Sequence, residues 1–94
     1  MNDTANNESA LANAVQASAI EFLKVELKIG NTMLDLAAST DERETHARRY
    51  AQAKEACNTV KRYLAGPAVP LPVEDHRVIA DGLGALEQRI AAAS

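Results

Sequence analysis

Residues 20–37, IEFLKVELKIGNTMLDLA, decide the fold of this 94-residue chain. Their large apolar residues recur every three or four positions, which is the period of an α-helix, and no strand-like alternation persists. The same Ala- and Leu-rich pattern, without a proline, extends the predicted helix from about residue 8 to residue 38. The segment before it has no large apolar side chain after Met1, so we predict a disordered tail over residues 1–7.

The apolar residues of this first helix form two stripes that together span roughly 220° of its circumference at 100° per residue. One stripe contains Leu11, Val15, Phe22, Val25, Ile29, Met33 and Leu36. The second contains Ile20, Leu23, Leu27, Leu34 and Ala37. A surface helix needs an apolar face of only about 100°, so we expect this helix to be covered from two sides.

Two further helices complete the predicted domain. Ser39 and Glu42 match a capping box, which predicts the start of a second helix over about 41–65. The inner face of this helix would be a seam at heptad spacing, formed by His46, Tyr50, Ala53, Cys57, Val60 and Leu64. Gly66 and Pro67 end it, and the connector 66–72 leads to a third helix over about 73–92. The sequence therefore predicts one all-α domain over residues 8–94, in which a long antiparallel helical hairpin is covered by a shorter third helix.

Composition and charge narrow the function classes. The formal net charge is −3, which argues mildly against a phosphate-binding protein, and no apolar run is long enough to span a membrane. No basic-then-apolar leader is visible, and the single cysteine, Cys57, cannot form an internal disulfide. Both features favour a cytoplasmic location.

The residue patterns of common catalytic and metal sites are missing from the sequence. His46 and His76 have no cysteine or carboxylate at ligand spacing, and Cys57 lies on an apolar helical seam where a thiol is inert. There is no glycine-rich phosphate loop. We therefore expect no metal, no cofactor and no enzymatic activity.

Glu26 has the most unusual position, because it falls inside the broad apolar arc of the first helix. A carboxylate there must be paired, hydrogen-bonded or protonated. In a hairpin that turns near residues 39–40, Arg49 lies within reach of it. We predict a buried Glu26–Arg49 ion pair that fixes the register of the hairpin, and the alternative is a functional acid with a raised pKa.

The run Ile29-Gly30-x-x-Met33 is similar to part of the first helix of a tetratricopeptide repeat, and Ala53-x-x-x-Cys57 followed by Pro67 resembles its second helix. Glu26 stands where that family has a tryptophan. The resemblance covers residues 26–67 and implies a helical hairpin of the kind found in scaffold and microtubule-trafficking-type modules, which bind other proteins. It also implies that Gly30 faces Ala53 where the two helices cross.

These observations lead to a protein–protein interaction module whose partner is a second copy, as a homodimer, or another protein. We expect the second stripe of the first helix to stay partly exposed and to form the interface, through Ile20, Leu23, Leu27 and Leu34. The alternative is binding of nucleic acid or another polyanion through a basic face of the second helix, formed by Arg48, Lys54, Lys61 and Arg62 beside Tyr63.

Overall fold

The structure is a computed structural model that describes residues 3–93, with side chains described from residue 10 onward. Over this range the chain forms three α-helices: α1 (Asp3–Ala38), α2 (Arg43–Ala65) and α3 (Val73–Ala93). The predicted all-α, three-helix fold is confirmed. The helix α1 begins at Asp3, ahead of the predicted start near residue 8, so it includes residues 3–7 of the predicted tail, and residues 1 and 2 lie outside the described residues.

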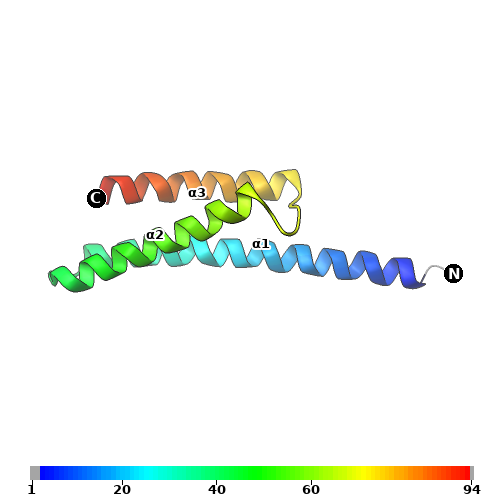
Figure 1. The fold of residues 1–94 in the computed structure, drawn as a ribbon, viewed down its shortest axis with the longest axis horizontal. Helices are drawn as coiled ribbons and strands as arrows, with labels where there is room; N and C mark the ends of the chain where they lie inside the picture. Colours follow the sequence, from blue (N-terminus) through cyan, green and yellow to red (C-terminus); the bar gives the residue numbers. More distant parts are fainter. Residues whose placement is uncertain (1–2, 94) are drawn as a thin grey trace.

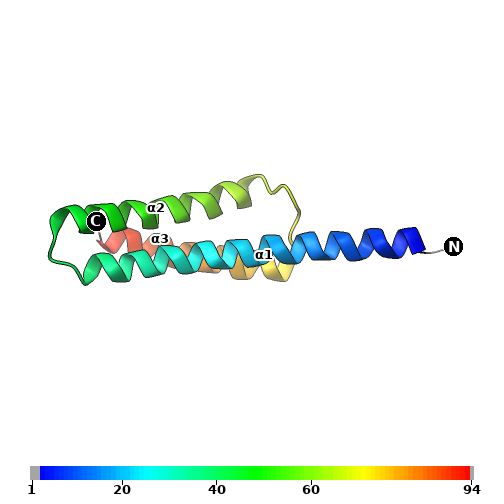
Figure 2. The same ribbon diagram turned by 90° about the horizontal axis from the view of Figure 1, so that it is seen from below.

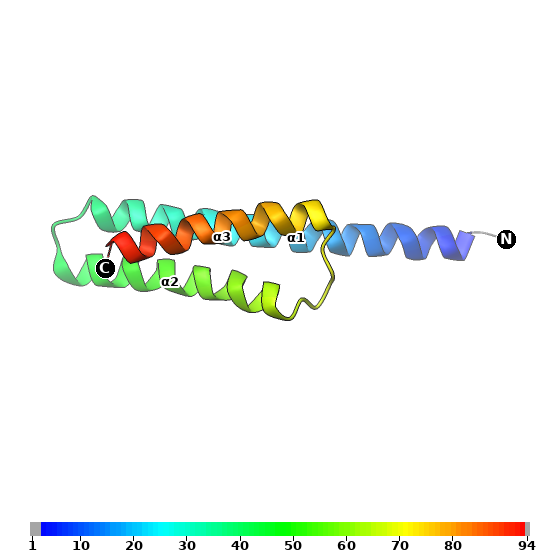
Figure 3. The same ribbon diagram turned by 90° about the horizontal axis from the view of Figure 1, so that it is seen from above.

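The three helices form an elongated bundle of 64 × 19 × 17 Å (Figure 1). The helices α1 and α2 form the antiparallel hairpin, and α1 has more contacts with α2 than with α3. Seen from above, α3 is in front and runs across α1 (Figure 3), and from below α1 is in front of α3 (Figure 2). The N-terminal part of α1 extends well beyond both other helices (Figure 1).

The core lies where the three helices meet. Its largest fully buried side chains are Leu23, Val60, Ile79 and Leu86, which come from all three helices. Two glycines bring α1 and α3 close together: a Cβ atom added at Gly30 would lie 2.6 Å from Leu86 Cδ2, and one added at Gly82 would lie 2.9 Å from Leu27 Cδ1. These short distances show that the side chains of one helix fill the space left by the glycines of the other.

The turn between α1 and α2 differs from the predicted capping box. The N-cap of α2 is Glu42, which makes no side-chain capping bond, and Ser39 Oγ instead donates to the Leu36 carbonyl at 3.1 Å. The Glu42 amide donates to Thr40 Oγ1 at 3.2 Å. His46 Nδ1 lies 2.9 Å from the Ala37 carbonyl, so a protonated Nδ1 satisfies one of the last carbonyls of α1, which have no partner within their own helix.

Tyrosine hydroxyls and one glutamine hold the remaining segments in place. Tyr63 Oη donates to the Val69 carbonyl at 2.9 Å and accepts from the Val69 amide at 3.3 Å, which ties the connector to α2. Gln16 Nε2 donates to the Pro70 carbonyl at 2.7 Å, so the connector also meets α1. Tyr50 Oη donates to the Ile90 carbonyl at 3.1 Å and joins α2 to the last turns of α3.

Candidate interaction surface on helix α1

The most prominent surface feature is a line of exposed residues along α1. Its large apolar side chains keep 38–66% of their surface exposed: Leu11, Val15, Phe22, Val25, Ile29 and Leu36. Ser18 and Thr32 are also exposed and fill the two gaps in the line. We call these eight residues the exposed seam. Their spacing alternates between four and three residues without interruption from Leu11 to Leu36, which is the heptad pattern of a coiled coil.

The position of α3 explains why this line stays exposed. Another side of α1 carries a second row at helical spacing, which we call the core row, and its buried members are Leu23, Gly30, Leu34 and Ala37. Leu23 and Leu34 of this row belong to the hydrophobic core, and Leu27 packs against that core. At 100° per residue the two rows are centred roughly 130° apart, so a helix seated on one row leaves the other free. Met33, on the flank towards α2, is half-buried.

The exposed seam is long enough and apolar enough to pack against another helix. From Leu11 to Leu36 it runs for roughly 38 Å at 1.5 Å per residue. Burying a side chain of this size completely is worth about 1.5–3 kcal/mol, so the half still exposed is worth about 1 kcal/mol. Six such residues on each of two copies provide on the order of 12 kcal/mol, against an association cost of about 4–15 kcal/mol. This balance allows a moderate affinity, with a dissociation constant on the order of micromolar or weaker.

The structure corrects the predicted interface of Ile20, Leu23, Leu27 and Leu34. Leu23 is 0% exposed and Leu34 is 5% exposed, because α2 and α3 cover the second stripe of α1. Ile20 and Leu27 are only half-exposed. The two stripes are as predicted, but their roles are exchanged: the stripe assigned to the core is the exposed one, apart from Met33.

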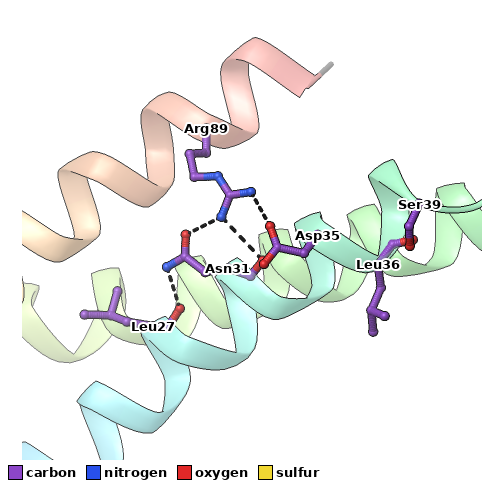
Figure 4. Close-up of polar contacts among 6 residues, drawn as sticks. All are labelled: Leu27, Asn31, Asp35, Leu36, Ser39 and Arg89. Carbon is purple, nitrogen blue, oxygen red and sulfur yellow. Dashed lines mark hydrogen bonds and ion pairs between the residues drawn. The ribbon is translucent and has the colours of Figure 1, made fainter.

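A polar cluster holds α3 on the core row of α1, beside the exposed seam. Arg89 of α3 donates from Nη1 to Asn31 Oδ1 and from Nη2 to Asp35 Oδ1, both at 2.7 Å, and Asn31 Nδ2 donates to the Leu27 carbonyl at 2.9 Å (Figure 4). In the same view the Leu36 side chain extends from the side of α1 turned away from α3 (Figure 4). The cluster therefore supports an arrangement in which Leu36 stays free.

The predicted Glu26–Arg49 ion pair is not formed within residues 3–93. Arg49 Nη1 instead donates to Gln52 Oε1 at 3.2 Å and lies 4.0 Å from Met33 Sδ. Met33 is seven residues from Glu26, or roughly 10 Å along the helix, so the hairpin register places Arg49 too far towards the turn. Glu26 lies between the exposed seam and the buried row of α1 and is half-exposed, so water can solvate its carboxylate.

The basic face of α2 is partly engaged with the chain itself. Lys61 Nζ lies 3.6 Å from Glu87 Oε2, Arg62 Nη2 lies 3.7 Å from Glu55 Oε1, and the Lys54 ammonium lies 5.6 Å from the centre of the Tyr50 ring. The Tyr63 hydroxyl is bonded to the connector. These contacts leave fewer free positive charges than the sequence suggested.

Cys57 is a buried free thiol near an open hollow of about 220 Å³ between α2 and α3, whose lining also includes Lys54, Glu87 and Ile90. Burial raises the pKa of the Cys57 thiol, and the Glu87 carboxylate raises it further. The thiol is therefore protonated and unreactive at neutral pH.

Within residues 3–93 no group of three or more His, Cys, Asp and Glu residues is placed to hold a metal ion. In the same range no helix combines the length and the apolar character needed to cross a membrane.

The chain matches no known protein family, and neither a curated protein nor a solved structure matches it significantly. The tetratricopeptide resemblance also fails at its central contact. The nearest atoms to a Cβ at Gly30 belong to Leu86 of α3, not to Ala53 of α2. Gly30 therefore serves the packing of α1 against α3.

Proposed function

We propose that this chain is a protein–protein interaction module, without a reaction of its own, that self-associates through the exposed seam of α1. The observation that carries the proposal is the uninterrupted heptad spacing of exposed residues from Leu11 to Leu36. An apolar line of this length on a helix with no neighbour on that side within residues 3–93 is typical of a surface that packs against a further helix.

The composition of the seam supports helix pairing over a loose apolar contact. Phe22, Val25 and Ile29 form its centre, and β-branched and aromatic side chains there have few rotamers to lose on packing. Ser18 and Thr32 are small enough to leave room for larger residues opposite them. Two copies can bury this surface against each other about a two-fold axis, and two-fold dimers are the commonest homo-oligomers.

The test is a seam substitution compared with a matched control. Phe22→Asp places a charge at the centre of the seam, and Ala17→Asp adds the same charge to an exposed position of α1 outside both apolar rows. By sedimentation velocity at several hundred micromolar, the wild-type chain and Ala17→Asp should sediment as dimers and Phe22→Asp as a monomer. Circular dichroism should show the same helix content in all three proteins. A Phe22→Asp protein that associates like the wild type would contradict the proposal.

A further inference from the structure

We infer that the partner on the exposed seam is a second copy of this chain in antiparallel orientation, and that Glu21 and Lys28 set this orientation. The inference rests on the proposed function, because it specifies how the same seam is occupied. It follows from the order of side chains along the seam and from the charges on its two flanks.

The seam is complementary to itself when one copy is reversed. In an antiparallel pair with a two-fold axis at the level of Leu23 and Lys24, all eight positions of one seam meet a position of the other. The layers are Leu11 with Leu36, Val15 with Thr32, Ser18 with Ile29, and Phe22 with Val25. Each hydroxyl residue thus faces a β-branched apolar residue, and in the two middle layers Phe22 of each copy packs against Val25 of the other. The whole seam is buried without an overhang.

The flanking charges favour this reversed pairing. Residues beside the seam form ion pairs between helices and determine the orientation of a coiled coil. On one flank lie Ala14, Glu21, Lys28 and Asp35. In the antiparallel pair Glu21 faces Lys28 of the second copy, and the symmetry repeats this attraction once. On the other flank Glu26 faces Ala19, and Met33 faces Ala12. No two like charges meet on either flank.

A parallel pair has the opposite electrostatics. In a parallel coiled coil the flank residue of one helix meets the opposite-flank residue five positions later in its partner. Glu21 then faces Glu26 of the second copy, and this repulsion occurs twice. Lys28 faces Met33, so it has no carboxylate partner there. The same surface charges therefore stabilise the antiparallel pair and destabilise the parallel one.

The shape of the chain agrees with the reversed arrangement. The N-terminal part of α1 extends beyond α2 and α3 (Figure 1), and Leu11 on it is 66% exposed. In the antiparallel pair this projecting part lies along the C-terminal part of the second copy's α1, which runs beside α2 (Figure 2). Each copy thereby supports the part of its partner's α1 that has no bundle of its own.

Charge reversal tests the orientation directly. At low salt Glu21→Lys should weaken the dimer about tenfold, because the introduced lysine would face Lys28 at both symmetric positions, and Lys28→Glu should weaken it about tenfold by bringing two glutamates together. An equimolar mixture of the two variants should regain wild-type affinity as a heterodimer, since every flank pair then joins a lysine to a glutamate. Lys24→Glu, an exposed α1 position outside both flanks, is the matched control and should stay within about twofold of wild type.

The outcomes separate the orientation from the association itself. A wild-type chain that stays monomeric at about 1 mM would overturn both the proposed function and this inference. A dimer that Glu21→Lys strengthens would be parallel, because that variant pairs the introduced lysine with Glu26, and it would overturn the orientation alone. A dimer that both variants leave unchanged, or a mixture that fails to regain affinity, would also overturn the orientation while self-association stands. Sedimentation equilibrium of each protein and of the mixture distinguishes these results.

Discussion

Replacing Gly30 with alanine tests whether α3 lies on the core row of α1 and so leaves the exposed seam free. In an open helical position this substitution stabilises, because glycine is about 1 kcal/mol less favourable than alanine in a helix. At Gly30 the added Cβ would lie 2.6 Å from Leu86 Cδ2 and 3.3 Å from Leu86 Cδ1. Leu86 is fully buried, so its side chain can move only by displacing neighbours in the core.

The expected magnitude follows from these two opposing effects. Inserting a methyl group into a packed core costs about 1–3 kcal/mol, which offsets or exceeds the gain in helix propensity. We therefore expect Gly30→Ala to lower the free energy of unfolding by about 0–2 kcal/mol. For a domain of this size a loss of about 1 kcal/mol lowers the melting temperature by roughly 4–8 °C.

Gly84→Ala is the matched control, since no atom lies within 4 Å of a Cβ added there. It should raise stability by up to about 1 kcal/mol. Both variants would be compared with wild type by urea denaturation followed by circular dichroism, at a concentration low enough to keep the chain monomeric. Equal stabilisation by the two substitutions would mean that Leu86 does not pack on Gly30, and the placement of α3 would be wrong.

Two further predictions concern α3 and the core. Arg89→Ala removes the contacts with Asn31 and Asp35. Because these groups are largely exposed, the free energy of unfolding should fall by at most about 1 kcal/mol, and by less in about 1 M salt. A fall that is unchanged in high salt would contradict the electrostatic account. Burial raises the pKa of the Cys57 thiol, so as the pH rises above about 8.5 the unfolded chain loses the thiol proton before the folded chain does. Deprotonation therefore stabilises the unfolded state, and the free energy of unfolding should fall as the pH rises. A Cys57→Ala variant should not show this added decline, and at pH 8 the native thiol should react with a thiol reagent at least about tenfold more slowly than in denaturant.

Much of the fold can be predicted from the sequence, because the ends of the helices depend on residues close to them in the chain. Gly66 and Pro67 end α2 near the predicted residue, and the prolines after them hold the connector that precedes α3. The sequence pattern places the start of α1 several residues too late, since the polar residues at its beginning carry no apolar signal to mark them. The tight turn at Ser39–Glu42 differs from the predicted capping box because several of its residues can serve as caps.

The candidate interface shows what a single sequence cannot determine. Helical periodicity identifies both apolar stripes of α1, but it does not say which one faces the rest of the chain. The small residues Gly30 and Ala37 on the second stripe were the available signal, because they allow close approach of another helix. The Arg89 contact with Asp35 joins residues 54 positions apart, and no local pattern predicts such a pair.

The molar mass of the wild-type chain in solution, measured by light scattering on a sizing column at two concentrations, tests the central claim most directly. At about 10 µM the mass should lie near the 10.0 kDa of a single chain, and at several hundred micromolar it should rise towards twice that value, as expected for a dissociation constant on the order of 100 µM. A mass of 10.0 kDa at both concentrations would show that the exposed seam does not pair with a second copy.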